Sequence, residues 1–206
     1  MTERRTFLQA LGVLSLGMLL PESLYAASAP LVVYFSKAGE QYGLGVIEKG
    51  NTKIAAEILA KKVHADLCEI TVKNDSYPRT YKALCDVAKK EKERKERPPY
   101  EKTVPDIGGY NVIFIGAPVW YGDWPMVMYS FFENEALSGK TLIPFSTHAG
   151  SGLSEFDKKL ARACPGSKVA SGLAILGSDT QKKPIHVEKR IEGWLKKLSA
   201  QGIVLY

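Results

Sequence analysis

The most constraining feature of this sequence is the regular alternation of short apolar runs with segments of helical periodicity. The first run, Leu31 to Phe35, contains no charged residue, which is typical of a strand that is buried on both faces. We expect strands over 31–35, 66–72, 111–116, 140–146 and 167–176, and helices over 51–63, 78–97, 126–134, 153–163 and 184–198. Such an alternation predicts an α/β fold, a five-stranded parallel sheet with helices on both faces.

The composition is that of one ordinary globular domain, which we expect to span residues 30–206. With 45% hydrophobic and 24% charged residues, disorder, collagen and coiled coil are excluded as descriptions of the whole chain. Cys68, Cys85 and Cys164 are too few for a disulfide-rich scaffold, and no Cys-x-x-Cys pair offers a zinc site. We expect them to be small buried hydrophobic residues, although two of them could pair in an exported protein.

The basic residues outnumber the acidic ones by 28 to 22, a net charge of +6. Such a surplus is compatible with an acidic partner or a membrane surface. No segment interleaves Lys and Arg with aromatic residues as a stacking groove would, so no nucleic-acid partner is expected. The densest charged run, Lys89 to Arg97, alternates in sign and is predicted to be a solvated helix face.

The first 29 residues are predicted to be an export signal rather than part of the fold. Arg4 and Arg5 precede Thr6-Phe7-Leu8, which resembles the twin-arginine export motif, and small residues at 26–29 suit a signal peptidase. The apolar stretch has eleven residues, from Ala10 to Leu20. About 20 would be needed to cross a bilayer, which favours a cleaved signal over a permanent anchor. An N-terminal helix packed on the domain is the alternative.

The twin-arginine route carries proteins that have already folded, often with a cofactor bound. We therefore expect a periplasmic protein that is loaded with its cofactor in the cytoplasm. Contact with the membrane is expected only through the export signal.

Ligands of an open α/β sheet bind beyond the carboxyl ends of its strands, so the loops there are the candidate site. After the first strand, Ser36 to Gly39 is followed, beyond an insertion, by Gly50-Asn51-Thr52 at a helix start. Small and hydroxyl residues at a helix N-terminus bind anions, and a phosphate is the expected ligand. The alternative is that Asn51 or Thr52 only caps the helix. No nucleoside-triphosphatase loop and no dinucleotide-binding glycine motif is present.

Two further loops complete the candidate site. Trp120 and Tyr121 lie on a loop framed by glycine and proline, which favours stacking on a flat ring over a plain hydrophobic cover. The loop from Ser146 to Gly152 offers many backbone donors, which suits the edge of a heteroaromatic ring. His148 in that loop, taken alone, is more typical of a structural histidine than of a catalyst.

The order and spacing of these loops resemble the flavodoxin family, especially its bacterial branch with Pro-x-Trp-Trp/Tyr-Gly and Thr-His-x-Gly-Ser-Gly loops. The resemblance runs from Leu31 to about Leu198 and implies a three-layer sandwich of strand order 2-1-3-4-5 that binds one FMN non-covalently. It assigns the phosphate to Ser36, Ala38, Asn51 and Thr52. One side of the ring is assigned to Pro118, Val119, Trp120, Tyr121 and Gly122, and its pyrimidine edge to Thr147, His148, Gly150, Ser151 and Gly152. An insertion, Glu40 to Lys49, splits the phosphate motif.

Three functions remain open at the level of the sequence. The first is electron transfer through FMN to a redox partner protein or a small-molecule acceptor. The second is an FMN-dependent NAD(P)H:quinone-type oxidoreductase. It is favoured by the loss of a tyrosine that many flavodoxins carry in the loop containing His148, because an uncovered ring face admits a substrate. The third is a non-redox binding module. No metal site is expected.

Overall fold

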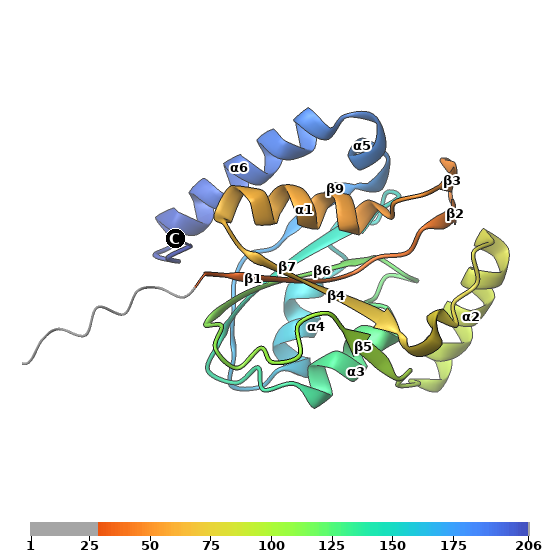
Figure 1. The fold of residues 1–206 in the computed structure, drawn as a ribbon, viewed down its shortest axis with the longest axis horizontal. Helices are drawn as coiled ribbons and strands as arrows, with labels where there is room; N and C mark the ends of the chain where they lie inside the picture. Colours follow the sequence, from red (N-terminus) through yellow and green to blue (C-terminus); the bar gives the residue numbers. More distant parts are fainter. Residues whose placement is uncertain (1–28, 206) are drawn as a thin grey trace, which may run out of the picture.

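The computed structural model describes residues 29–205, so nearly all of the predicted export signal lies outside the described residues. One large sheet runs through the middle, with helices above and below it (Figure 1). This arrangement is the expected three-layer sandwich.

The parallel strands follow the order 2-1-3-4-5 that the resemblance implied. The order across the sheet is β5-β4-β1-β6-β7-β8, and β9 also pairs with β7. The parallel strands are β1 (Leu31–Phe35), β4 (Asp66–Val72), β6 (Val112–Pro118), β7 (Thr141–His148), β8 (Lys168–Val169) and β9 (Leu173–Leu176). One further strand, β5 (Tyr100–Lys102), adds an antiparallel edge to β4 that the sequence did not predict.

The fifth parallel strand is broken in two, so the prediction of one strand over 167–176 is wrong. β8 pairs with β7 at Leu142 and β9 rejoins it at Phe145, so three residues oppose two between these points. Pro144 lies opposite the break and has no N–H to donate to a ladder. The Trp194 indole donates to the carbonyl of Ser171 (2.9 Å), which satisfies one acceptor in the broken segment.

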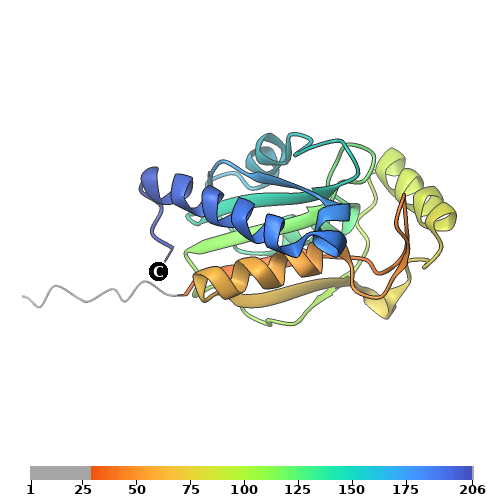
Figure 2. The ribbon, with the colours of Figure 1, turned by 90° about the horizontal axis from the view of Figure 1, so that it is seen from above.

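Helices cover both faces of the sheet, as Figures 1 and 2 show. One face carries α1 (Asn51–Val63), the short α5 (Gly177–Lys182) and α6 (Pro184–Ala200), and the other carries α3 (Met126–Asn134) and α4 (Phe156–Ala163). Helix α2 (Tyr81–Arg94) lies beyond the end of the sheet, where it contacts α3. The side chains of β1 alternate between the two layers. Val32 and Tyr34 pack with the α1 and α6 side, whereas Val33 and Phe35 pack with the α3 and α4 side. The strand is therefore buried on both faces, as predicted.

Several element boundaries differ from the prediction for reasons of backbone geometry. The charged helix expected over 78–97 ends at Arg94 because Lys95 is left-handed, with φ 51°, and its N–H closes the helix end. The helix expected from residue 153 begins at Phe156 because Ser154 and Glu155 have positive φ. Strand β7 continues through His148, which was expected in a loop.

The insertion folds into a two-stranded hairpin, β2 (Gly39–Gln41) and β3 (Gly45–Ile47), beside the start of α2 (Figure 1). The N–H of Glu40 donates to the carbonyl of Arg79, and the N–H of Tyr81 donates to the Glu40 carboxylate, both at 2.8 Å. At Gly39 (φ 107°) a Cβ would lie 2.6 Å from that Arg79 oxygen, so only glycine fits. The hairpin is thus fixed to the chain just before α2.

The cysteines are all unpaired in the described structure. Cys68 and Cys164 are buried, as expected, whereas Cys85 on α2 is partly exposed. Within residues 29–205, no helix has the length and apolar character needed to cross a membrane. The same residues contain no group of His, Cys, Asp and Glu that could hold a metal ion.

Candidate functional site

A cavity of about 620 Å³ lies at the carboxyl ends of β1, β6 and β7, where the three candidate loops meet. Its size is in the range of small-molecule sites. Nine of the residues singled out from the sequence line it: Ser36, Asn51, Thr52, Pro118, Val119, Trp120, Tyr121, Thr147 and His148. The other five, Ala38, Gly122, Gly150, Ser151 and Gly152, lie outside its lining, and Ala38 borders a smaller neighbouring hollow.

The N-terminus of α1 offers backbone donors to this cavity. Gly50 is the N-cap and has no side chain to accept them, and no acidic residue lies in the first turn. The Ser36 hydroxyl caps the helix instead, accepting the N–H of Lys53 at 3.0 Å. Within the described residues this leaves the N–H groups of Asn51 and Thr52 without a protein acceptor. Uncapped N–H groups at the positive end of a helix form an anion site.

The side chain of Asn51 is oriented by the short helix α5. Its amide oxygen accepts hydrogen bonds from Thr180 (3.1 Å) and Gln181 (2.9 Å). The amide nitrogen therefore lies on the other side, next to Gly177 in the wall of the cavity. This geometry leaves its N–H groups as donors for a ligand.

Thr52 and Thr147 bring two buried hydroxyl groups to the same wall. Their oxygens are 2.7 Å apart, although 95 residues separate them in the chain. Only one hydrogen can lie between two hydroxyl oxygens, so the second hydrogen is available to another acceptor. A buried hydroxyl without such an acceptor would be costly, which favours an acceptor-rich ligand here.

Trp120 forms part of the opposite wall and is supported from behind. Its ring makes edge contacts with Phe35 (5.4 Å between centroids) and Tyr77 (5.3 Å). The Tyr77 hydroxyl donates in turn to the buried Glu91 carboxylate at 2.7 Å. Burial raises the pKa of Glu91 above its usual value. Trp120 is therefore a fixed aromatic surface, whereas Tyr121 beside it is 48% exposed.

The turn from Trp120 to Asp123 is closed by two backbone hydrogen bonds of 2.9 and 3.0 Å between its ends. Tyr121 and Gly122 at its tip both have positive φ, 50° and 70°. Such a conformation suits glycine but is uncommon for tyrosine. Contacts outside the turn therefore add to the two hydrogen bonds within it.

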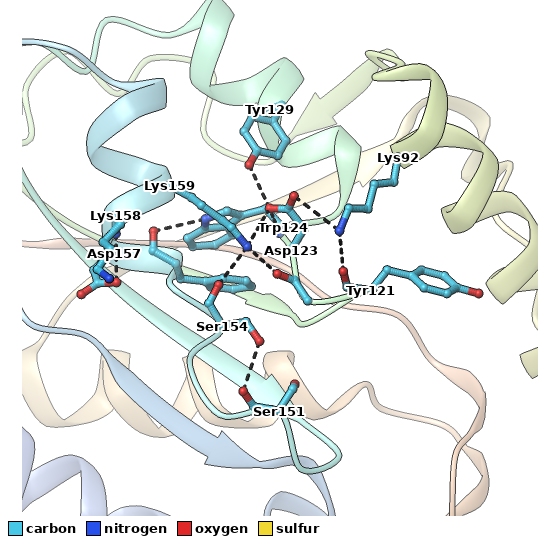
Figure 3. A network of polar contacts seen from close by, with 12 residues as sticks. Lys92, Tyr121, Asp123, Trp124, Tyr129, Ser151, Ser154, Asp157, Lys158 and Lys159 are labelled. Atoms are coloured by element: carbon cyan, nitrogen blue, oxygen red, sulfur yellow. Dashed lines mark hydrogen bonds and ion pairs between the residues drawn. The ribbon is translucent and has the colours of Figure 1, made fainter.

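Those contacts come from two lysines that approach from different helices (Figure 3). Lys92 on α2 donates to the carbonyl of Tyr121 at 2.5 Å, and Lys159 on α4 donates to the carbonyl of Gly122. Asp123 lies between the two ammonium groups, 3.8 Å from Lys92 and 3.5 Å from Lys159. We call this arrangement of Lys92, Lys159 and Asp123 the lysine clamp.

Replacing Lys159 with methionine is expected to lower the free energy of unfolding by about 1–2 kcal/mol, because it removes charge-assisted hydrogen bonds in a half-buried place. Methionine keeps the apolar stem, so packing changes little. Denaturant unfolding measures the effect. Lys158→Met is the matched control, since Lys158 is exposed and, among residues 29–205, its ammonium pairs with Glu155 alone. Equal effects of the two substitutions would contradict the role assigned to the clamp.

His148 is held in one neutral form by its surroundings. Burial, and then the nearby Arg190, lower its pKa below the usual value. Its Nδ1 accepts the N–H of Gly150 at 3.0 Å, so the proton lies on Nε2. His148 thus acts as an organiser of its loop and also offers one N–H donor at the cavity.

Several lining residues were not identified from the sequence. Lys182 and Ser178 come from α5, a helix that the sequence analysis did not predict, and Lys182 adds a positive charge near the α1 N-terminus. Tyr42 and Tyr81 come from the hairpin and from the first residue of α2. The exposed tyrosine in a ten-residue insertion was the one signal that could have pointed to this part of the site.

The comparisons with known proteins agree with this fold. A family model described as flavodoxin matches residues 31–192. A structure from Bacteroides eggerthii, described as a flavoprotein, is 28% identical and superimposes with a TM-score of 0.62, covering 83% of this chain and 98% of its own. One from Bacteroides uniformis is 25% identical, with a TM-score of 0.61 and coverages of 82% and 97%.

A third solved structure, a flavoprotein from Lactobacillus acidophilus in complex with FMN, is 21% identical with a TM-score of 0.57. It covers 75% of this chain and 97% of its own, and at that identity the likeness concerns the fold. No curated protein matches the sequence of this chain.

Proposed function

Because the chain belongs to the flavodoxin family, we propose that it binds one FMN non-covalently and transfers electrons through it. The observation that carries the proposal is the meeting, in one cavity, of an anion site at the α1 N-terminus and a fixed aromatic wall at Trp120. FMN combines a phosphate with a flat heteroaromatic ring and therefore needs both. When bound, it supplies reversible electron uptake, while the protein binds and orients it.

The phosphate is assigned to the wall that carries donors and positive charge. The N–H groups of Asn51 and Thr52, the Asn51 amide and the hydroxyls of Ser36 and Thr52 all donate there. Lys182 adds a charge opposite to that of a phosphate dianion. Ala38, which the resemblance assigned to the phosphate, borders the neighbouring hollow instead of this cavity.

The ring is assigned to the opposite wall. Pro118, Val119 and Trp120 supply apolar surface for one side of it, with Tyr121 at the cavity mouth. Thr147 and His148 reach the edge of the ring from the end of β7, and the proposal includes Gly122, Gly150, Ser151 and Gly152 as backbone neighbours of the ring.

An FMN titration tests the proposal. We expect protein lacking its export signal to bind one equivalent of FMN, measured as quenching of flavin fluorescence, and to show flavin absorbance when purified with it. A chain that binds no FMN would contradict the proposal and favour a non-redox binding module.

A second candidate function is an FMN-dependent NAD(P)H:quinone-type oxidoreductase. It is favoured by the open mouth of the cavity, where Tyr121 is half exposed and leaves room beside the turn. Electron transfer to a redox partner protein or to a small-molecule acceptor would use the same opening. Steady-state turnover of NAD(P)H with a quinone separates the candidates, because a carrier that needs a protein partner will not turn over with these two substrates alone.

We also propose that the chain is exported to the periplasm by the twin-arginine route. Replacing Arg4 and Arg5 together with lysine keeps the charge but removes the guanidinium geometry, and is expected to abolish export. Cell fractionation followed by immunoblotting measures the periplasmic fraction. A double variant that still reaches the periplasm with bound flavin would contradict this route.

A further inference from the structure

Three tyrosines gather at the mouth of the cavity, and they come from three separate segments. Tyr42 lies in the β2–β3 hairpin, Tyr81 begins α2, and Tyr121 lies at the tip of the turn after β6. Their exposed fractions are 69%, 40% and 48%, although all three line the cavity. The rings of Tyr42 and Tyr81 are 6.0 Å apart and tilted by 42°. We call Tyr42, Tyr81 and Tyr121 the tyrosine wall.

The backbone that carries the tyrosine wall is fixed, although the rings themselves are exposed. Glu40 joins the hairpin to the start of α2 through hydrogen bonds at both its N–H and its carboxylate. The Tyr121 hydroxyl donates to the carbonyl of Cys85 at 3.1 Å, and Lys92 holds the Tyr121 carbonyl. The positions of the rings are therefore set by tertiary contacts rather than by chance exposure on a flexible loop.

The wall is bordered by apolar side chains, and Lys37 and Glu40, the cavity-lining charged residues next to the hairpin, are each already engaged. Leu44, Leu84 and Ala88 line the same part of the cavity. Glu40 is engaged by the Tyr81 N–H, and the Lys37 ammonium pairs with Asp75 at 2.8 Å. An uncharged flat ligand can pack against these apolar side chains without breaking either contact, which favours it here over an ionic one.

Exposed aromatic faces at the mouth of a cavity favour ligands that can stack on them. Aromatic pairs gain energy in offset or edge geometries beyond the burial of their area. Tyr121 is also assigned to one side of the FMN ring, whereas Tyr42 and Tyr81 are not among the residues to which FMN is assigned. The exposed rings of Tyr42 and Tyr81 are thus available for a second ligand, which would lie beside the FMN ring at Tyr121.

We propose that the tyrosine wall is a binding site for a second, flat and uncharged aromatic ring system, the class to which quinones belong. The inference rests on the proposed function, because it takes the rest of the cavity to be filled by FMN. It deepens that function by assigning a substrate class to the open side of the site.

The test is a titration of FMN-loaded, ¹⁵N-labelled protein with a dimethylnaphthoquinone, whose thiol-reactive ring positions are blocked so that Cys85 cannot add to it. Amide chemical shifts report both the binding constant and the integrity of the fold. Tyr42→Ala and Tyr81→Ala are each expected to raise the Kd about three- to tenfold. Tyr42→Phe keeps the ring and is expected to keep the affinity within about twofold of the unsubstituted protein.

Val46→Ala is the matched control on the same hairpin. Val46 is as exposed as Tyr42, at 69%, but does not line the cavity. Its substitution is expected to change the Kd of the naphthoquinone by less than about twofold. The Kd of FMN, titrated separately, is expected to stay within about twofold in every variant.

Three results would overturn the inference: no saturable binding of the naphthoquinone, a Kd of the naphthoquinone that is unchanged in Tyr42→Ala and Tyr81→Ala, or displacement of FMN by the naphthoquinone. The last would show that the ring had entered the flavin space. Failure of FMN itself to bind would appear in the separate titration and would overturn the proposed function instead.

Discussion

Replacing Trp124 with alanine is expected to lower the free energy of unfolding by about 3–5 kcal/mol. Trp124 is fully buried directly after the turn, and its ring stacks on Phe156 with centroids 3.7 Å apart. It also meets Phe132 edge-on, and its indole N–H donates to the Phe156 carbonyl at 3.3 Å. Alanine would leave a large cavity between α3 and α4, because neither helix can collapse without disturbing the sheet.

Thermal and denaturant unfolding measure this loss, and the melting temperature is expected to fall by roughly 6–20 °C for a chain of this size. Trp124→Phe is the graded control, since it keeps an aromatic ring but loses the indole N–H. It is expected to lower the free energy of unfolding by less than half as much as Trp124→Ala. Tyr121→Ala, three residues earlier but half exposed, is expected to cost less than about 1 kcal/mol. A loss below 1 kcal/mol for Trp124→Ala would contradict the packing role.

Replacing Thr52 with valine is expected to raise the Kd of FMN by about 10- to 150-fold. Valine has the shape of threonine without the hydroxyl, so it removes a hydrogen bond to a charged phosphate, worth about 1.5–3 kcal/mol. The fold should tolerate the change, because the α1 backbone and its cap at Ser36 stay intact. Flavin-fluorescence titration measures the affinity.

Thr141→Val provides the matched control, since Thr141 begins β7 at the opposite end of the same strand that carries Thr147. It is expected to leave the Kd of FMN unchanged. A double-mutant cycle with Thr147→Val adds a sharper criterion. The two hydroxyls share a hydrogen bond, so their losses should be non-additive. Unchanged FMN affinity in Thr52→Val would contradict the assigned phosphate position.

The parallel part of the fold could be predicted from the sequence because its signals are local. Strands such as Leu31 to Phe35 are buried on both faces and therefore appear as unbroken apolar runs. Pro125 before α3 and Pro184 at the start of α6 mark their helices in the same way. Burial and proline geometry act within a few residues, so a single sequence contains them.

The added edge strand β5 could not be predicted because its stability depends on distant residues. Tyr100 and Lys102 both bind the carboxylate of Glu135, each at 2.5 Å, and Glu135 lies beyond α3. A three-residue segment of mixed polarity carries no strand signal of its own. Its pairing with β4 is decided by a side-chain contact 33–35 residues away.

Part of the candidate site could likewise be predicted from local sequence, and part of it depends on distant contacts. The loops after β1, β6 and β7 were identified from their residues, because the strands before them fix which edge of the sheet they reach. The positions of Lys182 and Tyr42 could not be predicted from the sequence. They depend on how α5 folds back over α1 and on how the insertion attaches to α2. Such contacts join segments without any periodic pattern to reveal them.

The lysine clamp has a consequence for the kinetics and thermodynamics of ligand entry. Ordering a backbone residue costs about 1–2 kcal/mol of free energy through lost conformational entropy. A loop that closes only around its ligand incurs that cost during binding. Here the turn from Trp120 to Asp123 is already tied to two helices, so its entropy is lost when the protein folds. For the FMN binding proposed above, the turn would therefore act as a preformed template, and we expect association to be limited by diffusion into the cavity rather than by loop closure.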